Sequence, residues 1–256
     1  MPRLTDPHVI RSILRRDPIW SVYALGDLAP AMFAKTLWFG PDLTLVLHDY
    51  GTSILFAIGT RSIREALDHA TSPVHLQVQR DALDEVSRHA DVRDAREMWR
   101  MVWHGPSNRG RHIHPERDIN PGPVVRLGAD DVPALQQLYA DGDATGESPD
   151  FFYPSMVSDG VFFGLYEDRQ LVAAAGTHLL AREEGAAAIG NVYTRRDCRG
   201  CGLSRLVTGA VMTALAGIET VGLNVRADNA AAIRVYESLG FVRHCPFFEG
   251  LATVRK

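Results

Sequence analysis

The chain has 256 residues, of which 46% are hydrophobic and 23% are charged, so it is long enough to bury a core of its own. Its net charge of −4 argues against the basic surface that nucleic-acid binding requires. Three cysteines are too few for a disulfide framework, and no apolar run approaches the roughly 18 residues of a membrane span. We expect a globular cytoplasmic protein, a monomer or a homodimer, with neither nucleic acid nor membrane as partner.

Residues 1–104 alternate between helical and extended patterns. A helix is predicted after Asp6, because Asp is a good N-cap, Pro7 suits the first helical position and apolar residues follow at helical spacing. A hairpin is predicted from "LTLVLHD" and "TSILFAIG", which flank a turn. The helix "SIREALDHA", the strand "VHLQV", the helix "DALDEVSRHA" and the strand "EMWRMVWH" follow. The pattern predicts a mixed α/β domain without a glycine-rich phosphate loop.

Residues 105–121 are rich in Gly, Pro, Asn and charge and have no periodicity, which is typical of a linker. They separate a predicted first domain, residues 1–104, from a predicted second domain, residues 122–256. His112 and His114 lie in this segment, where solvated loop residues are the simpler interpretation of both. We expect no metal site here.

The second domain begins with the predicted strand "VVRL" and a helix from about Asp130 to Ala140. The polar loop "DGDATGESPD" and the aromatic "FFYPSM" come next. Three strands are predicted after them: "VFFGLYE", "QLVAAAGTHLL" and "AAAIGNVYT". The small residues of the third strand permit close approach of another chain, and Gly190 in it is compatible with a bulge.

The loop "RRDCRGCGLSR", residues 195–205, stands between this strand and a predicted amphipathic helix. Gly200 and Gly202 let the backbone approach a ligand, and the first helical turn offers unpaired N–H groups and a positive dipole end. With Arg199 at its rim, the loop suits a phosphate; a plain tight turn is the alternative. Cys198 and Cys201 have C-x-x-C spacing, but zinc needs about four ligands, so no metal is expected.

A second segment, "NVRADNAAAIRVYESLGF", covers residues 224–241 and predicts a strand end, a helix capped near Asp228 and ended by Gly240, and a further strand. Ile233, Tyr236 and Leu239 share one face of this helix. Taken alone, Tyr236 is better interpreted as an ordinary, half-buried core tyrosine.

The two segments, in this order, resemble the signatures of the GNAT superfamily of acyl-CoA-dependent N-acyltransferases. The first is similar to the family's pyrophosphate-binding segment, [QR]-x-x-G-x-[GA], here Asp197 to Gly202. The second is similar to N-x-x-A-x-x-x-Y-x-x-x-G-F, here with Asn229, Ala232 and Tyr236. The resemblance covers residues 122–248. One position departs from it: Asp197 replaces the family's Gln or Arg, and we expect its side chain to turn away from a pyrophosphate.

Residues 1–104 resemble, more loosely, the N-terminal part of the glycine N-acyltransferase-like branch, which is a second, degenerate GNAT-like unit. The resemblance therefore implies an α/β fold of the α+β type: a tandem GNAT-like fold in which helices flank a mixed twisted sheet. It also implies an N-acetyltransferase that takes acetyl-CoA as co-substrate, uses no metal and acetylates a primary amine of a small molecule or peptide.

By the same resemblance, the pantetheine arm of acetyl-CoA pairs with the strand before the loop, and the pyrophosphate lies on the loop itself. The residues assigned to acetyl-CoA binding on this basis are Val192, Tyr193, Thr194, Arg199, Gly200, Cys201, Gly202, Leu203, Ser204, Asn229, Ala232 and Tyr236.

The resemblance makes Tyr236 the acid that protonates the leaving thiolate. Three candidates remain for the base: His178, whose ordinary pKa suits the task, Asn191 through an ordered water, and Glu147. A structural strand histidine is the alternative for His178. The alternative function is an acyl-CoA-binding regulatory module whose catalysis has decayed. A dinucleotide-binding protein fits less well, because the loop lacks the first glycine of G-x-G-x-x-G.

Overall fold

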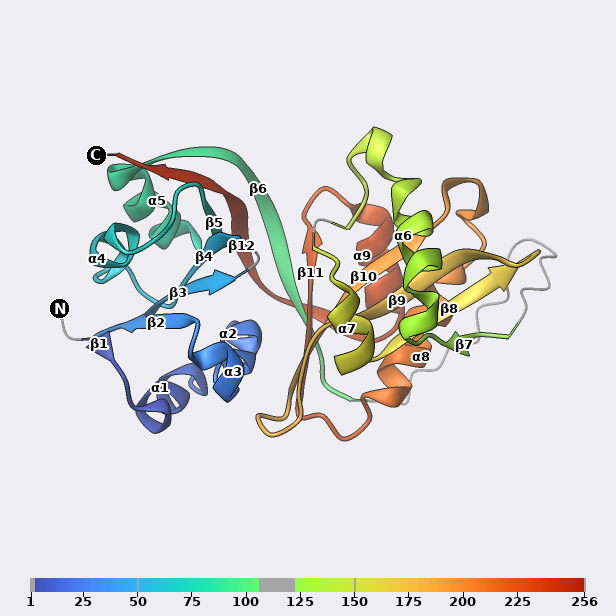
Figure 1. Cartoon of the computed structure of the whole chain (residues 1–256), viewed down its shortest axis with the longest axis horizontal. Coiled ribbons are helices and arrows are strands. Elements are labelled where there is room, and N and C mark those ends of the chain that lie inside the picture. Colours follow the sequence, from blue (N-terminus) through green and yellow to red (C-terminus); the bar gives the residue numbers. More distant parts are fainter. Residues whose placement is uncertain (1–2, 50, 106–122, 150, 256) are drawn as a thin grey trace. The chain divides into compact units, whose positions relative to one another are not determined.

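The computed structural model describes residues 3–49, 51–105, 123–149 and 151–255 (Figure 1). The chain divides into two compact units, each described here by itself. Unit 1 comprises Met1–Met101, Asn224–Ala230 and Arg243–Lys256; unit 2 comprises Val102–Leu223 and Ala231–Val242. Apart from Gly105, the predicted linker lies outside the described residues, as do His112 and His114. The domain boundary at 105–121 stays a prediction.

Unit 1 has the strand order β1-β2-β3-β4-β5-β12-β6. β4 and β5 run parallel, whereas β1 to β4 pair antiparallel in succession and β5 pairs antiparallel with β12. Its elements are β1 (Arg3–Leu4), α1 (Pro7–Leu14), α2 (Val22–Gly26), α3 (Pro30–Phe33), β2 (Thr36–Phe39), β3 (Thr44–Asp49), β4 (Thr52–Ala57), α4 (Ile63–Asp68), β5 (Val74–Val78), α5 (Arg80–His89), β6 (Ala90–Trp103) and β12 (Phe241–Val254).

Several local predictions for unit 1 are confirmed. The Asp6 side chain caps α1 by accepting a hydrogen bond from the His8 N–H at 2.8 Å. The hairpin forms between β3 and β4, and β5 coincides with "VHLQV". By contrast, α2, α3 and β2 were not predicted, because segments of four or five residues are too short to show a clear period.

The compact units differ from the predicted domains at two segments. Asn224–Ala230 and Arg243–Lys256 fall in unit 1, although the sequence analysis assigned both to the second domain. The physical reason for the second is strand pairing: Phe248 of β12 lies opposite Val78 of β5, and Ala252 lies opposite Val74.

Unit 2 has the strand order β11-β10-β9-β8-β7. β10 and β11 run parallel, and the other neighbours are antiparallel. Its elements are β7 (Val125–Arg126), α6 (Val132–Ala140), α7 (Pro154–Asp159), β8 (Phe162–Glu167), β9 (Gln170–Ala181), β10 (Ala186–Thr194), α8 (Leu203–Ala214), β11 (Thr220–Arg226) and α9 (Ala230–Ser238), with short 3₁₀ turns at Ala129–Asp131, Asp143–Thr145 and Arg196–Cys198.

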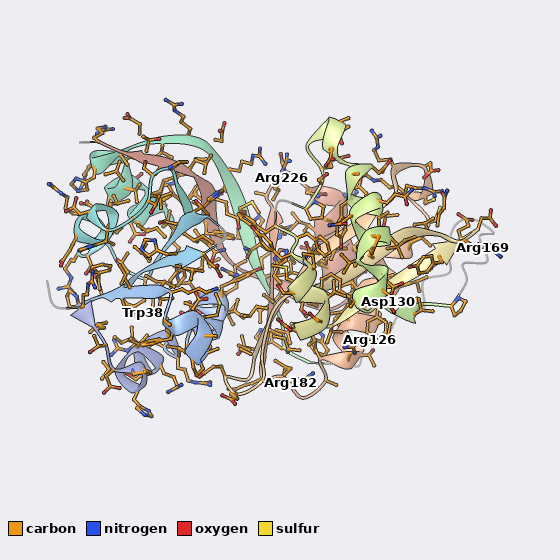
Figure 2. All side chains as sticks on the ribbon, in the orientation of Figure 1. Trp38, Arg126, Asp130, Arg169, Arg182 and Arg226 are labelled. Carbon is orange, nitrogen blue, oxygen red and sulfur yellow. The ribbon has the colours of Figure 1, made fainter. Side chains whose placement is uncertain are left out.

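The long hairpin of β9 shows how turn chemistry shapes unit 2. Asp168 and Arg169 both have positive φ, 47° and 66°, and turn β8 into β9 as the sequence predicts. Figure 2 labels Arg169 at this end of β9 and Arg182 just beyond the other end.

Within the described residues, no helix is both long and apolar enough to cross a membrane.

Both units repeat one strand pattern. An antiparallel meander, β1 to β4 or β7 to β10, ends in a strand whose next neighbour, β5 or β11, runs parallel to it. A parallel neighbour requires a crossover, which α4 supplies in unit 1 and α8 in unit 2. The crossovers differ in length, because α4 has 6 residues and α8 has 12. The mixed α+β fold expected from the sequence is confirmed.

The core of unit 2 beneath α6 and α7 depends on small residues in β9 (Figure 1). Phe162 is fully buried there with Leu135, Tyr139 and Tyr193. A Cβ on Gly176 would lie 2.4 Å from the Phe162 ring, so only glycine lets this ring pack against the strand. The packing brings α6 down onto β10, where the candidate site lies.

Candidate functional site

The central feature of the site is a bulge in β10. The pairing of β10 with β9 shifts register between Gly190 and Tyr193, and Asn191 adopts a positive φ of 52°. Asn tolerates this left-handed conformation better than most residues. The Tyr139 hydroxyl of α6 donates a buried hydrogen bond of 3.0 Å to the Asn191 carbonyl. The bulge expected near Gly190 is therefore present, and this hydrogen bond ties it to α6.

Beyond the bulge, β10 loses its parallel neighbour. The ladder between β10 and β11 runs from Ala186 opposite Thr220 to Ile189 opposite Leu223 and ends there. Residues 190–194 thus present an edge to which an extended, amide-bearing ligand could add as a further strand. Val192, Tyr193 and Thr194, predicted to bind acetyl-CoA, lie on this stretch.

The loop after β10 leaves open space at the start of α8. Gly200 and Gly202 have positive φ values of 79° and 74°, and a Cβ on either would meet no atom within 4 Å. Gly202 is the N-cap residue of α8 and offers no side-chain cap, so Leu203 and Ser204 begin the helix with backbone donors at its positive end. These residues fit a phosphate group.

The arginines of the loop are held by acidic partners. Arg199 donates to Glu147 at 3.1 Å and to the Thr194 carbonyl at 3.2 Å, and its guanidinium lies 5.5 Å from the centre of the Tyr193 ring. The Asp197 carboxylate, which departs from the family motif, accepts a hydrogen bond of 2.6 Å from Arg195. This bond lowers the pKa of Asp197. Its negative charge is therefore compensated within the loop.

Asp141, at the end of α6, ties the loop to β10. Its carboxylate accepts from the backbone N–H of Arg196 and from the Tyr193 hydroxyl, both at 3.0 Å. The bond from the Arg196 N–H is the main cause of the lowered pKa of Asp141. The sequence analysis missed this residue, because nothing local indicates a partner more than 50 positions away.

Two of the predicted base candidates come together at the bulge. A Cβ on Gly190 would lie 2.4 Å from the His178 ring, so glycine allows that ring to rest against β10. Asn191 is buried; its Nδ2 lies 3.5 Å from the Met156 sulfur, and its Oδ1 has no hydrogen-bond partner within the described structure. Glu147, the third candidate, is instead paired with Arg199, a bond that lowers its pKa.

Tyr236 and its neighbours lie on and before α9. The Tyr236 ring is buried and packs edge-on against Phe241 at 6.0 Å between centroids. Burial raises the pKa of Tyr236 to about 12, so its hydroxyl stays protonated at neutral pH. Ala232 lies on α9, and Asn229, just before it, donates its N–H to the Arg226 carbonyl at 3.0 Å. The roles of these residues stay predictions.

The corresponding turn of unit 1, before α4, is closed. The Asp42 carboxylate accepts from the Arg61 N–H at 3.0 Å and lies 3.4 Å from the Ser62 hydroxyl. A Cβ on Gly59 would lie 2.3 Å from the same carboxylate. At the start of α8, unit 2 leaves room for an anion. At the start of α4, unit 1 has the Asp42 carboxylate in the corresponding place.

Comparison with known proteins gives the family of the chain. The Acetyltransferase (GNAT) family model matches residues 132–241. A [ribosomal protein bS18]-alanine N-acetyltransferase of Salmonella typhimurium is 32% identical over 117 residues, which make up 45% of this chain and 77% of that enzyme. The chain belongs to the GNAT acetyltransferase family.

Two further likenesses bear on the architecture. A mycothiol acetyltransferase of Streptomyces coelicolor is 39% identical over 88 residues, which cover 32% of this chain but only 27% of that protein. A tandem GNAT protein from the clavulanic acid biosynthesis pathway has the same fold, with a TM-score of 0.58 at 14% identity over 99% of this chain and 98% of that one.

Membership in the family confirms the predicted enzyme class. The chain is a GNAT-family N-acetyltransferase, and the family uses acetyl-CoA as its co-substrate. The matched residues include the bulge, the open loop and Tyr236. Residues 1–104 lie outside the match, so their likeness to the glycine N-acyltransferase-like branch stays a prediction.

The open space at Gly202 generates the first test. Gly202→Glu places a negative charge in this open space, and like charges about 4 Å apart repel strongly enough to weaken acetyl-CoA binding by about 100-fold or more. Calorimetric titration measures the loss. Gly217→Glu is the matched control: Gly217 has φ +95° and open space around it but lies beyond the far end of α8. Equal acetyl-CoA affinity in the two folded variants would contradict the assignment of the loop.

Proposed function

We propose that the chain transfers the acetyl group of acetyl-CoA to a primary amine of a small molecule or peptide by direct attack at the β10 bulge of unit 2. One observation carries the proposal: the unpaired stretch of β10 runs directly into an open, glycine-lined helix N-terminus. A strand edge suits the amide-bearing arm of acetyl-CoA, and the helix start suits its pyrophosphate.

In this proposal the backbone of β10 binds the arm of acetyl-CoA and stabilises the negative charge that develops on the thioester oxygen. The arm pairs along Val192, Tyr193 and Thr194, and an N–H group next to the bulge points at the thioester carbonyl. A fixed donor there stabilises the oxyanion that forms when the amine attacks. The hydrogen bond between Tyr139 and the Asn191 carbonyl supports this role, because it fixes the bulge without needing a ligand.

We assign proton transfer to residues on both sides of the reacting carbon. Asn191 is a candidate on the amine side, because its buried Oδ1 has no hydrogen-bond partner among the described residues. It can accept a hydrogen bond from an ordered water that carries the proton of the amine away. His178, whose ring lies against Gly190, is the titratable candidate. Tyr236 is the proposed acid for the thiolate, since its raised pKa keeps the proton available at neutral pH.

The acceptor is proposed only as a class. The relatives act, by name, on the alanine of a ribosomal protein and in mycothiol acetylation, so both peptide and small-molecule amines are represented among them. The loop after α6 supplies Glu147 beside the loop that follows β10, and α7 supplies Met156 beside the bulge. We expect the segment that carries these two residues to select the amine. The monomeric or homodimeric state and the cytoplasmic location stay predictions.

Replacing Tyr236 tests the proposed acid. Tyr236→Phe removes the proton donor but keeps the ring, so we expect kcat to fall by about 100-fold with little change in acetyl-CoA affinity. Thiol release from acetyl-CoA in the presence of amino acids, polyamines, aminoglycosides and peptides provides the measurement. Tyr166→Phe, which loses a hydroxyl bonded to Asp131, is the control.

Unchanged turnover in Tyr236→Phe would make Tyr236 a packing residue. Tight acetyl-CoA binding with no thiol release for any amine in the wild type would instead favour the regulatory module over the enzyme.

Replacing Glu147 tests whether this residue competes with acetyl-CoA for Arg199. The two side chains are about two-fifths exposed, and exposed ion pairs contribute up to about 1 kcal/mol. Glu147→Gln should therefore tighten acetyl-CoA binding by up to about fivefold, which titration calorimetry can resolve. Glu85→Gln breaks a comparable pair with Arg88 in unit 1 and should leave the affinity unchanged. Weaker binding in Glu147→Gln would contradict the competition.

A further inference from the structure

Three carboxylates lie at the loop that we propose to bind the pyrophosphate of acetyl-CoA. Each is paired with a different arginine of that loop: Asp197 with Arg195 at 2.6 Å, Glu147 with Arg199 at 3.1 Å and Asp141 with Arg196 at 3.4 Å. Negative charge beside an anion site opposes binding, since like charges repel. Asp141 and Glu147, which come from outside the loop, therefore do not help acetyl-CoA to bind through their charge.

Asp141 differs from Glu147 in what it binds. Glu147 is paired with the Arg199 side chain and is 43% exposed, whereas the Asp141 side chain is 25% exposed. Asp141 accepts hydrogen bonds from the backbone N–H of Arg196 and from the Tyr193 hydroxyl, each at 3.0 Å. Hydrogen bonds to a carboxylate are stronger than those between neutral groups. One side chain therefore holds the start of the loop and the end of β10 to the end of α6.

The chain on both sides of Asp141 packs closely against β10. A Cβ on Gly142 would lie 2.6 Å from the Ser148 nitrogen and 3.0 Å from the Tyr193 hydroxyl, so glycine is needed at this turn. The Glu147 N–H donates to the Gly142 carbonyl at 3.0 Å, which closes the turn. Before Asp141, the Tyr139 ring meets the Tyr193 ring edge-on at 6.2 Å between centroids. These contacts hold the Asp141 backbone in place from both sides.

We propose that Asp141 is a positioning residue for acetyl-CoA: it orders the start of the loop, so that the N–H groups that follow already face the pyrophosphate. The inference rests on the proposed function, because it takes this loop as the pyrophosphate site. A loop that is ordered before binding gives higher affinity, since binding does not have to order it. Within the described structure, the hydrogen bonds of the Asp141 side chain go to Arg196 and Tyr193 and not to a residue assigned to proton transfer. Asp141 therefore acts on affinity and not on turnover.

The sign of the change in affinity tests this role. Asp141→Ala and Glu147→Gln each remove one negative charge beside the loop, so a purely electrostatic effect predicts tighter acetyl-CoA binding in both. Positioning predicts the opposite for Asp141→Ala: affinity should fall by about tenfold, because two hydrogen bonds to a charged group are lost. Its kcat at saturating acetyl-CoA should stay within about twofold of the wild type. Titration calorimetry measures the affinity, and thiol release with the most active amine measures kcat.

Tyr193→Phe is the second variant, because it breaks one of the two hydrogen bonds and leaves the charge of Asp141 in place. It should bind acetyl-CoA about threefold more weakly than the wild type. Wild-type or tighter binding in folded Asp141→Ala would overturn the proposal, as would a fall in kcat at unchanged affinity. If Asp141→Ala does not fold, unchanged affinity in Tyr193→Phe would overturn it.

Hydrogen exchange without acetyl-CoA separates this inference from the proposed function. The Arg196 amide should exchange about tenfold faster in Asp141→Ala than in the wild type, because its acceptor is gone. Faster exchange with unchanged acetyl-CoA affinity would refute the positioning role and leave the proposed function standing. A wild type that gives no saturable heat with acetyl-CoA would refute the proposed function and the inference together.

Discussion

A single buried hydrogen bond fixes the bulge on which the proposed site is built. The Tyr139 hydroxyl binds the Asn191 carbonyl, and this contact keeps a non-glycine residue at positive φ in the middle of a strand. The bulge turns β10 away from the regular ladder, so the stretch that follows no longer pairs with β11. Its edge is therefore available for the pairing with acetyl-CoA that we propose. Tyr139 in turn depends on the core around Phe162, which exists because Gly176 has no side chain.

The two units show how one strand pattern can support or exclude an anion. Both units cross from a meander strand to a parallel neighbour through a helix. In unit 2 the crossover begins with two glycines and a 12-residue helix, and the space at its start is open. In unit 1 the helix has 6 residues, and Asp42 bonds to the backbone at its start. We infer that this turn of unit 1 offers no phosphate site, because the Asp42 carboxylate occupies it.

Local sequence patterns predicted much of this structure. β5 and β10 have the predicted bounds, because short apolar runs between turn residues specify strands well. The loop before α8 was predicted from its two glycines and from the helical spacing of the apolar residues in α8. Asp141 and Tyr139 could not be predicted, since each acts on β10 or its loop across about 50 intervening residues. The pairing of β12 with β5 was missed for the same reason: an extended pattern does not specify its partner strand.

Hydrogen exchange of the backbone amides in the presence and absence of acetyl-CoA tests the central claim most directly. If the arm adds to β10 and the pyrophosphate caps α8, acetyl-CoA will slow exchange in peptides that cover residues 190–206. Peptides that cover residues 58–66, at the closed turn of unit 1, will exchange at the same rate with and without it. Slower exchange at residues 58–66, or no change at residues 190–206 under saturating acetyl-CoA, would contradict the account.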